Sequence, residues 1–154
     1  MLRAGSHAPD FALSDLRGEA APIATHLAAG PVLLAFFKVS CPTCQLTFPF
    51  LERMAAGGRL TVLGISQDNP ERTAEFCRIY GITFPVLVDP EEGNYAVSNA
   101  FRITHVPTMF LLEGERKIEW ALNGFDRKAL DQLGTRFRTD LFRPGERIPD
   151  FKPG

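Results

Sequence analysis

Hydrophobic residues form one nearly continuous run over residues 32–39, between Pro31 and Ser40. Strands that are buried on both faces of a parallel sheet have this pattern, because neither face meets water. Residues 45–56 then place apolar side chains at roughly helical spacing. The pattern therefore predicts a central buried strand that leads almost directly into a helix.

Shorter apolar segments alternate with helix caps and turn residues further along the chain, whereas residues 1–30 are mixed. Asn69 and Pro70 are typical of a helix start and Gly81 of a helix end. Asp126 can cap a last helix. The other expected strands are 60–66, 84–88, 108–112 and 117–122, and the other expected helices are 70–80, 95–101 and one beginning after Asp126. This order favours an α/β fold in which helices cover a sheet with a mixed edge.

The last part of the chain, residues 138–154, has a different character. Pro144, Pro149 and Pro153 disfavour regular structure there. Four apolar residues could still fasten this segment to the surface: Leu141, Phe142, Ile148 and Phe151. The expected organisation is one domain over residues 1–137, followed by a proline-rich C-terminal tail that packs on the domain or trails from it.

Composition and charge exclude several classes of protein. The 154 residues fit a single domain, and a net charge of −1 gives no basic surface of the kind that binds nucleic acid. No apolar run reaches the length of about 18 residues that a membrane span needs. As written, the chain is expected in the cytoplasm, because its start lacks the apolar core of a signal peptide. A periplasmic or extracytoplasmic location is expected instead if a leader has been removed.

Two of the three cysteines, Cys41 and Cys44, form a CxxC motif at the predicted junction of strand and helix. The first N–H groups of a helix lack internal partners and carry partial positive charge, so a thiolate at that place is stabilised. Cys44 lies one helical turn further on, within reach to resolve a mixed disulfide. Cys41 is therefore the expected attacking thiol and Cys44 the expected resolving thiol, with Cys44 more buried. Pro42, at the first turn, needs no N–H partner.

A zinc site is the alternative use of such a cysteine pair. Zinc would need two further ligands at suitable spacing. The available residues are scattered singly along the chain: His7, His26, His105 and Cys77. A redox pair is therefore favoured over a metal site, and neither a metal nor a cofactor is expected. Cys77 is expected to be a small buried hydrophobic side chain without a redox role.

Four short motifs in the expected order carry a resemblance to a known family. They are the opening Gly5-Ser6-His7-Ala8-Pro9-Asp10-Phe11-Ala12-Leu13, the strand end and CxxC in Phe36-Phe37-x-x-Ser40-Cys41-Pro42-Thr43-Cys44, the helix residue Pro49, and Val106-Pro107-Thr108. The chain resembles the thioredoxin superfamily over about residues 5–137. Within it, the chain is similar to the TlpA/ResA-like redoxin branch, close to the AhpC/TSA peroxiredoxins.

The resemblance implies a thioredoxin-like, three-layer α/β/α fold with a mixed central sheet and an N-terminal extension. It also implies a thiol–disulfide oxidoreductase that acts on protein or small-molecule disulfides, with a thioredoxin-reductase-like or glutathione electron donor. Pro107 is expected to be cis and to face the cysteines, and the backbone of Val106 to pair with an extended substrate. With Pro42 and Thr43, these residues make up the expected substrate-binding set.

The chain departs from the family pattern where an acid–base helper is usual. Ala35 stands where thioredoxins carry a buried Asp, and Thr47 where TlpA-like proteins often carry Glu. The residues considered as substitutes are Glu52 and Asp89, with solvent as a third possibility. Lys38 and His105 are candidates for tuning the pKa of Cys41, although each is also typical of an ordinary solvated side chain.

Two other functions remain open at this point. A thiol peroxidase of the peroxiredoxin type would also use Cys41, but Lys38 and Leu34 replace the Thr and Pro that such enzymes place before the peroxidatic cysteine. A non-catalytic metal carrier of the copper-assembly type would need two cysteines and a distant histidine, for which His105 is a poor match.

Overall fold

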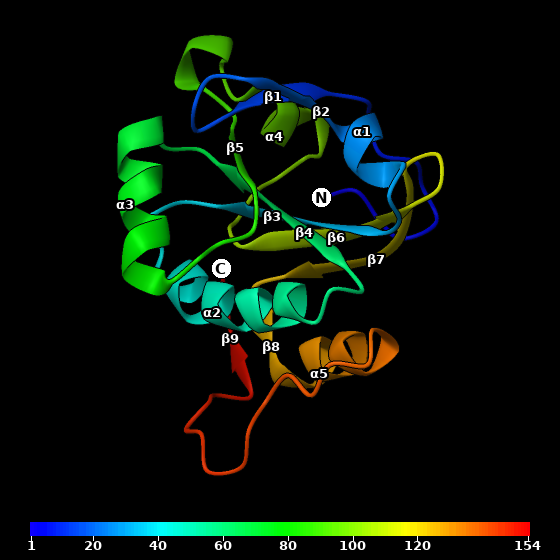
Figure 1. The fold of residues 1–154 in the computed structure, drawn as a ribbon, viewed down its shortest axis with the longest axis vertical. Coiled ribbons are helices and arrows are strands. Elements are labelled where there is room, and N and C mark those ends of the chain that lie inside the picture. Colours follow the sequence, from blue (N-terminus) through cyan, green and yellow to red (C-terminus); the bar gives the residue numbers. More distant parts are fainter.

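A computed structural model describes all residues, 1–154. A seven-stranded sheet with the order β2-β1-β5-β4-β3-β6-β7 runs through the molecule, and helices cover both of its faces (Figure 1). The strands of this sheet are β1 (Ala12–Asp15), β2 (Ala20–Pro22), β3 (Val32–Phe37), β4 (Thr61–Ser66), β5 (Val86–Val88), β6 (Thr108–Glu113) and β7 (Lys117–Asn123). The helices are α1 (Ile23–Leu27), α2 (Pro42–Ala56), α3 (Pro70–Tyr80), α4 (Ala96–Ala100) and α5 (Arg127–Arg136), with the 3₁₀ turn η1 (Glu91–Gly93). A second, two-stranded sheet pairs β8 (Phe125–Asp126) with β9 (Phe151–Lys152).

The central sheet is mixed. β3, β4 and β5 are parallel, whereas β6 is antiparallel to β3 and β1 is antiparallel to β5. All six residues of β3 are buried, as the continuous apolar run predicts. The predicted three-layer α/β/α fold with a mixed sheet is confirmed.

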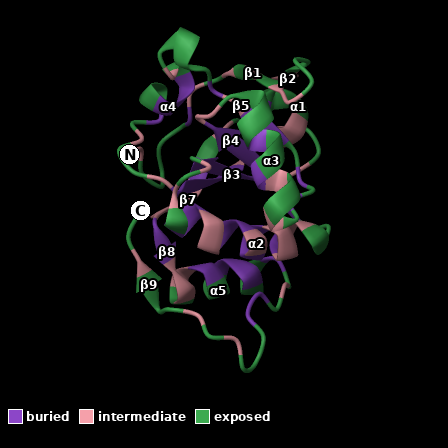
Figure 2. Cartoon of the chain, turned by 90° about the vertical axis from the view of Figure 1, so that its left-hand side faces the viewer, coloured by how far each residue is buried: buried purple, intermediate pink, exposed green.

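The side chains of β3 alternate between two hydrophobic clusters. Leu33, Ala35 and Phe37 join the cluster that α2, α3 and α5 cover, and the intervening residues of β3 join the cluster beneath α1 and α4. Buried residues accordingly line the inner sides of the helices in Figure 2. Because hydrophobic clusters cover both faces of the sheet, β3 is packed on both sides up to its last residue, and a short turn connects it to α2.

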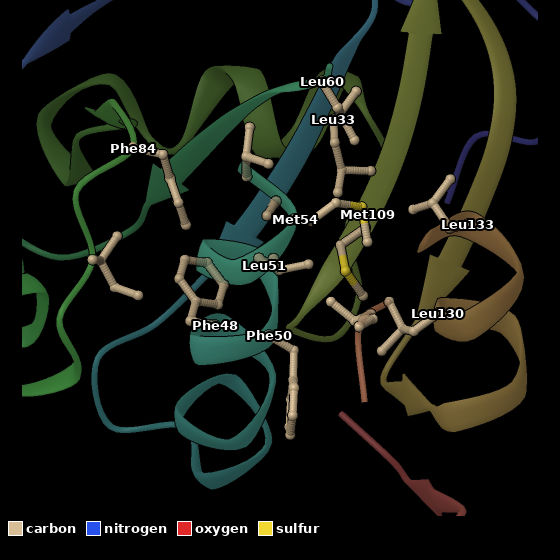
Figure 3. Packing of buried hydrophobic residues seen from close by; sticks show 14 of the residues in the cluster. Leu33, Phe48, Phe50, Leu51, Met54, Leu60, Phe84, Met109, Leu130 and Leu133 are labelled. Carbon is tan, nitrogen blue, oxygen red and sulfur yellow. The ribbon is translucent and has the colours of Figure 1, made fainter. Parts of the chain in front are cut away.

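The helix α2 is fixed to the sheet by large apolar side chains. Phe48, Leu51 and Met54 are almost fully buried, and the ring of Phe48 lies 4.3 Å from that of Phe37. Figure 3 shows these side chains of α2 directed toward the sheet. The position and direction of the first turn of α2 therefore depend on this packing.

The structure adds elements that the sequence pattern did not predict and changes the bounds of one expected strand. Residues 1–30 form β1, β2 and α1, whose short lengths and half-buried faces give only weak patterns. The strand expected at 84–88 is confined to β5. The tail was expected to lack regular structure, but it contains β9. This strand lies between Pro149 and Pro153, so neither proline has to donate a backbone N–H to the two-residue ladder.

The tail is fastened at several points. Leu141 and Phe142 are buried in the cluster beneath α2 and α5. Arg53 of α2 forms a bidentate ion pair with Glu146, with distances of 2.8 and 2.6 Å, and also donates to the carbonyl of Leu141. This pairing lowers the pKa of Glu146 to about 2, so the carboxylate stays charged until the pH falls to that range.

No helix of the structure combines the length and the apolar character that crossing a membrane requires.

Candidate active site

Cys41 is the N-cap residue of α2, directly after the turn that follows β3. Its backbone is extended, with φ −83° and ψ 114°, and its sulfur accepts a hydrogen bond from the N–H of Cys44 at 3.1 Å. Pro42 occupies the first helical position, where an N–H would have no partner. Cys44 is fully buried and Cys41 half-buried, which confirms the expected difference in exposure.

The two thiols have opposite electrostatic environments. A hydrogen bond from the Cys44 thiol, together with the backbone N–H groups of Cys44 and Thr43, lowers the pKa of Cys41 to about 6 despite partial burial. Burial, followed by the hydrogen bond to Cys41 and the negative charge of Asp68, raises the pKa of Cys44. Near neutral pH, Cys41 is therefore mostly a thiolate and Cys44 a thiol that can donate to it.

The loop before β6 faces the cysteines. The peptide bond between Val106 and Pro107 is cis, as the resemblance implies, and the Cys41 sulfur lies 3.4 Å from the carbonyl oxygen of Val106. Two hydrogen bonds hold this loop: from Thr108 to the carbonyl of His105 at 2.7 Å, and from the N–H of Gly124 to the carbonyl of Pro107 at 2.8 Å. Neither the N–H nor the C=O of Val106 takes part in a backbone hydrogen bond.

Residues of the tail also lie at the cysteine pair. The hydroxyl of Thr43, which is buried, donates to the carbonyl of Pro153 at 2.7 Å. The charge of Lys152 contributes to the lowered pKa of Cys41. Sequence reasoning missed both contacts, because more than a hundred residues separate the partners and no local pattern connects them.

The two residues considered for tuning the pKa of Cys41 lie beside the site, and the backbone carbonyl of Lys38 accepts from the N–H of Cys41 at 3.2 Å. Lys38 and His105 are both exposed and neither is among the groups that shift the pKa of Cys41; the cation that does so is Lys152. The side chain of His105 instead contacts the hydroxyl of Thr104 at 3.0 Å. Pro42 remains exposed at the rim of the site.

The carboxylates considered as acid–base substitutes have structural partners. Glu52 accepts hydrogen bonds from the N–H and hydroxyl of Thr83, and Asp89 accepts from the N–H groups at the start of α4. The carboxylate whose charge reaches Cys44 is Asp68, in the loop after β4, which also accepts from the N–H of Val39 at 2.8 Å. Sequence reasoning missed Asp68, because it follows a neighbouring strand and not the CxxC.

Metal-ligating side chains do not gather at this place. No group of three or more His, Cys, Asp or Glu residues in the structure could hold a metal ion. Cys77 lies apart from the pair, half-buried in α3, where burial raises the pKa of its thiol.

The model of the AhpC/TSA family matches residues 4–121, well over half of the chain. The chain belongs to the AhpC/TSA family. The matched region includes Cys41, Cys44 and the loop at Pro107, but it ends before the tail segment at the site.

Several proteins similar to this chain are named thiol–disulfide oxidoreductases. The thiol-disulfide oxidoreductase ResA of Geobacillus kaustophilus is 27% identical over 124 residues, which cover 78% of this chain and 69% of that protein. ResA of Bacillus subtilis is 25% identical over 147 residues, which cover 92% of this chain and 77% of that protein. The crystal structure of the thioredoxin domain of a thiol-disulfide oxidoreductase from Bacteroides vulgatus has a TM-score of 0.76 at 21% identity, covering 89% of this chain and 99% of that one. The relatives and the CxxC pair agree with the predicted class, an oxidoreductase acting on disulfides.

Proposed function

We propose that the chain exchanges thiols and disulfides through Cys41 and Cys44. The observation that carries this proposal is the placement of the Cys41 sulfur at the N-cap of α2, where it accepts the N–H of Cys44 at 3.1 Å and its pKa is lowered to about 6. Cys44 stands beside it as a buried thiol. A reactive thiolate next to a protonated partner is the arrangement that disulfide exchange requires.

The reaction divides into two displacements. The Cys41 thiolate attacks one sulfur of a substrate disulfide, a mixed disulfide forms, and the other substrate sulfur leaves as a thiolate that takes a proton from solvent. Cys44 then loses its proton to solvent and attacks the Cys41 sulfur, and the second substrate sulfur leaves as a thiolate that takes up a proton. Two electrons pass from the dithiol to the substrate, and the reverse sequence oxidises a substrate dithiol.

The groups that would receive the substrate are the backbone of Val106 beside Pro107 and the first turn of α2 at Pro42 and Thr43. The free N–H of Val106 and its carbonyl, close to Cys41, support this assignment, because an extended peptide segment can pair with such groups. The substrates proposed are disulfides of proteins or of small molecules.

The electron donor proposed is a thioredoxin-reductase-like protein or glutathione. Of the two compartments expected from the sequence, we propose the extracytoplasmic one, by analogy with the ResA relatives. We further propose that the chain divides into one domain over residues 1–137 and a tail over residues 138–154.

A comparison of two oxidants tests the function against the peroxidase alternative. The reduced protein is mixed with hydroxyethyl disulfide or with hydrogen peroxide, and the loss of free thiol at Cys41 is followed by alkylation and mass spectrometry. We expect hydroxyethyl disulfide to oxidise the Cys41–Cys44 pair faster than hydrogen peroxide does. A faster reaction with peroxide, through a sulfenic acid at Cys41, would assign the chain to the thiol peroxidases instead.

A further inference from the structure

Residues 151–154, which we call the strap, lie across the candidate active site. The carbonyl of Pro153 accepts from the buried hydroxyl of Thr43 at 2.7 Å. Gly154 lies so close to the loop that a Cβ atom built on it would stand 2.6 Å from the carbonyl oxygen of Val106. This is the same oxygen that faces the Cys41 sulfur at 3.4 Å.

The strap is positioned by the fold on its N-terminal side. Lys152 pairs with Phe125 in the ladder of β8 and β9, and the N–H of Arg127 donates to the carbonyl of Asp150 at 2.9 Å. Figures 1 and 2 show β9 beside β8 on the side of the molecule that carries α2 and α5. The close packing continues at Gly124, where a Cβ atom would stand 2.8 Å from the carbonyl oxygen of Lys152.

The strap and an extended protein substrate would compete for the same space. A substrate strand that paired with Val106 would approach its carbonyl from the direction where Gly154 now lies. Cys41 is only half-buried and its neighbours Ser40 and Pro42 are exposed, so part of the residue stays open to solvent. A small disulfide, which has no peptide backbone to pair, needs only this open side.

We propose that the strap makes the enzyme selective, so that Cys41 reacts readily with small-molecule disulfides while protein disulfides react only after residues 151–154 have moved away. The inference rests on the proposed thiol–disulfide exchange and adds the substrate class to it. The chemical step is unchanged: the Cys41 thiolate displaces one thiolate from the disulfide, and Cys44 displaces the second. The strap lies outside the part of the chain that the family model matches.

Deleting residues 151–154 tests the selectivity. Rates of oxidation of the reduced protein by insulin and by hydroxyethyl disulfide are measured at about pH 8, where Cys41 is ionised, and their ratio is compared with that of the full chain. If the strap leaves the backbone of Val106 uncovered for only a minor part of the time, its removal raises the ratio of the insulin rate to the small-disulfide rate about tenfold or more. A ratio that stays within about twofold in the folded deletion variant would overturn the proposal.

Two point variants separate the contact from other effects of the tail. Gly154→Ala adds a Cβ atom that cannot stand 2.6 Å from the Val106 oxygen, so the strap must shift and the ratio rises; this variant decides the question if the deletion variant does not fold. Lys152→Gln removes the charge near Cys41 but keeps the backbone of β9, so both rates change together and their ratio is preserved. A rise of the ratio in Lys152→Gln equal to that of the deletion would refute blocking by the strap. A full chain that reacts with neither disulfide would instead refute the proposed function itself.

Discussion

Cys41→Ser is expected to lower disulfide-exchange turnover by about a thousandfold or more, because a serine hydroxyl is not ionised near neutral pH and cannot attack a disulfide. The substitution removes one sulfur and leaves the N-cap in place, since serine also caps helices well. Turnover is measured as reduction of hydroxyethyl disulfide with an added dithiol as electron source.

Cys44→Ser is expected to give the complementary result. Cys41 can still attack, but no second thiol resolves the mixed disulfide, so the substrate remains covalently attached. The adduct is detected by mass spectrometry and disappears on reduction. Cys77→Ser is the matched control and should leave turnover within about twofold, because Cys77 lies in α3 away from the pair. Retained turnover in Cys41→Ser, or an adduct on Cys77, would contradict the assignment.

Phe48→Ala is expected to destabilise the fold by about 3–5 kcal/mol, the range found when a buried phenylalanine is truncated. Phe48 is fully buried and its ring lies 4.3, 5.6 and 5.8 Å from the rings of Phe37, Phe76 and Phe84. The cavity would thus open between α2, β3 and α3. For a domain of this size, the midpoint of thermal unfolding should fall by roughly 6–20 °C.

Ile79→Ala is the matched control for this prediction. Ile79 also lies on a helix of the same layer, but 58% of it is exposed. Its truncation should change the free energy of unfolding by less than about 0.5 kcal/mol. Equal losses of stability in the two variants would show that Phe48 does not anchor α2 as the packing indicates.

The geometry around the cysteine pair was predictable because contiguous residues carry it. A buried strand, a CxxC motif and a helix start follow one another within a few positions, and their order alone places Cys41 at unpaired N–H groups. The loop at Pro107 lies far away in sequence, and its position came from the resemblance to the family.

The remaining features could not be predicted because long-range packing decides them. Thr43 and Pro153 are 110 residues apart, and neither has a neighbour that indicates the contact. The charges of Lys152 and Asp68 act on the thiols through space from separate segments of the chain. Lys38 is closer in sequence but meets Cys41 through its backbone carbonyl, and Glu52 is bonded to Thr83.

The acidity of Cys41 tests the central claim most directly. The ultraviolet absorbance of thiolate is recorded as the reduced protein is titrated, with Cys41→Ser as the reference. The expected result is one thiolate that appears as the pH rises through about 6 and is missing in Cys41→Ser, while Cys44 stays protonated well beyond that range. A thiol at Cys41 that ionises only near its ordinary value of about 8.5 would contradict the electrostatic basis of the proposed reaction.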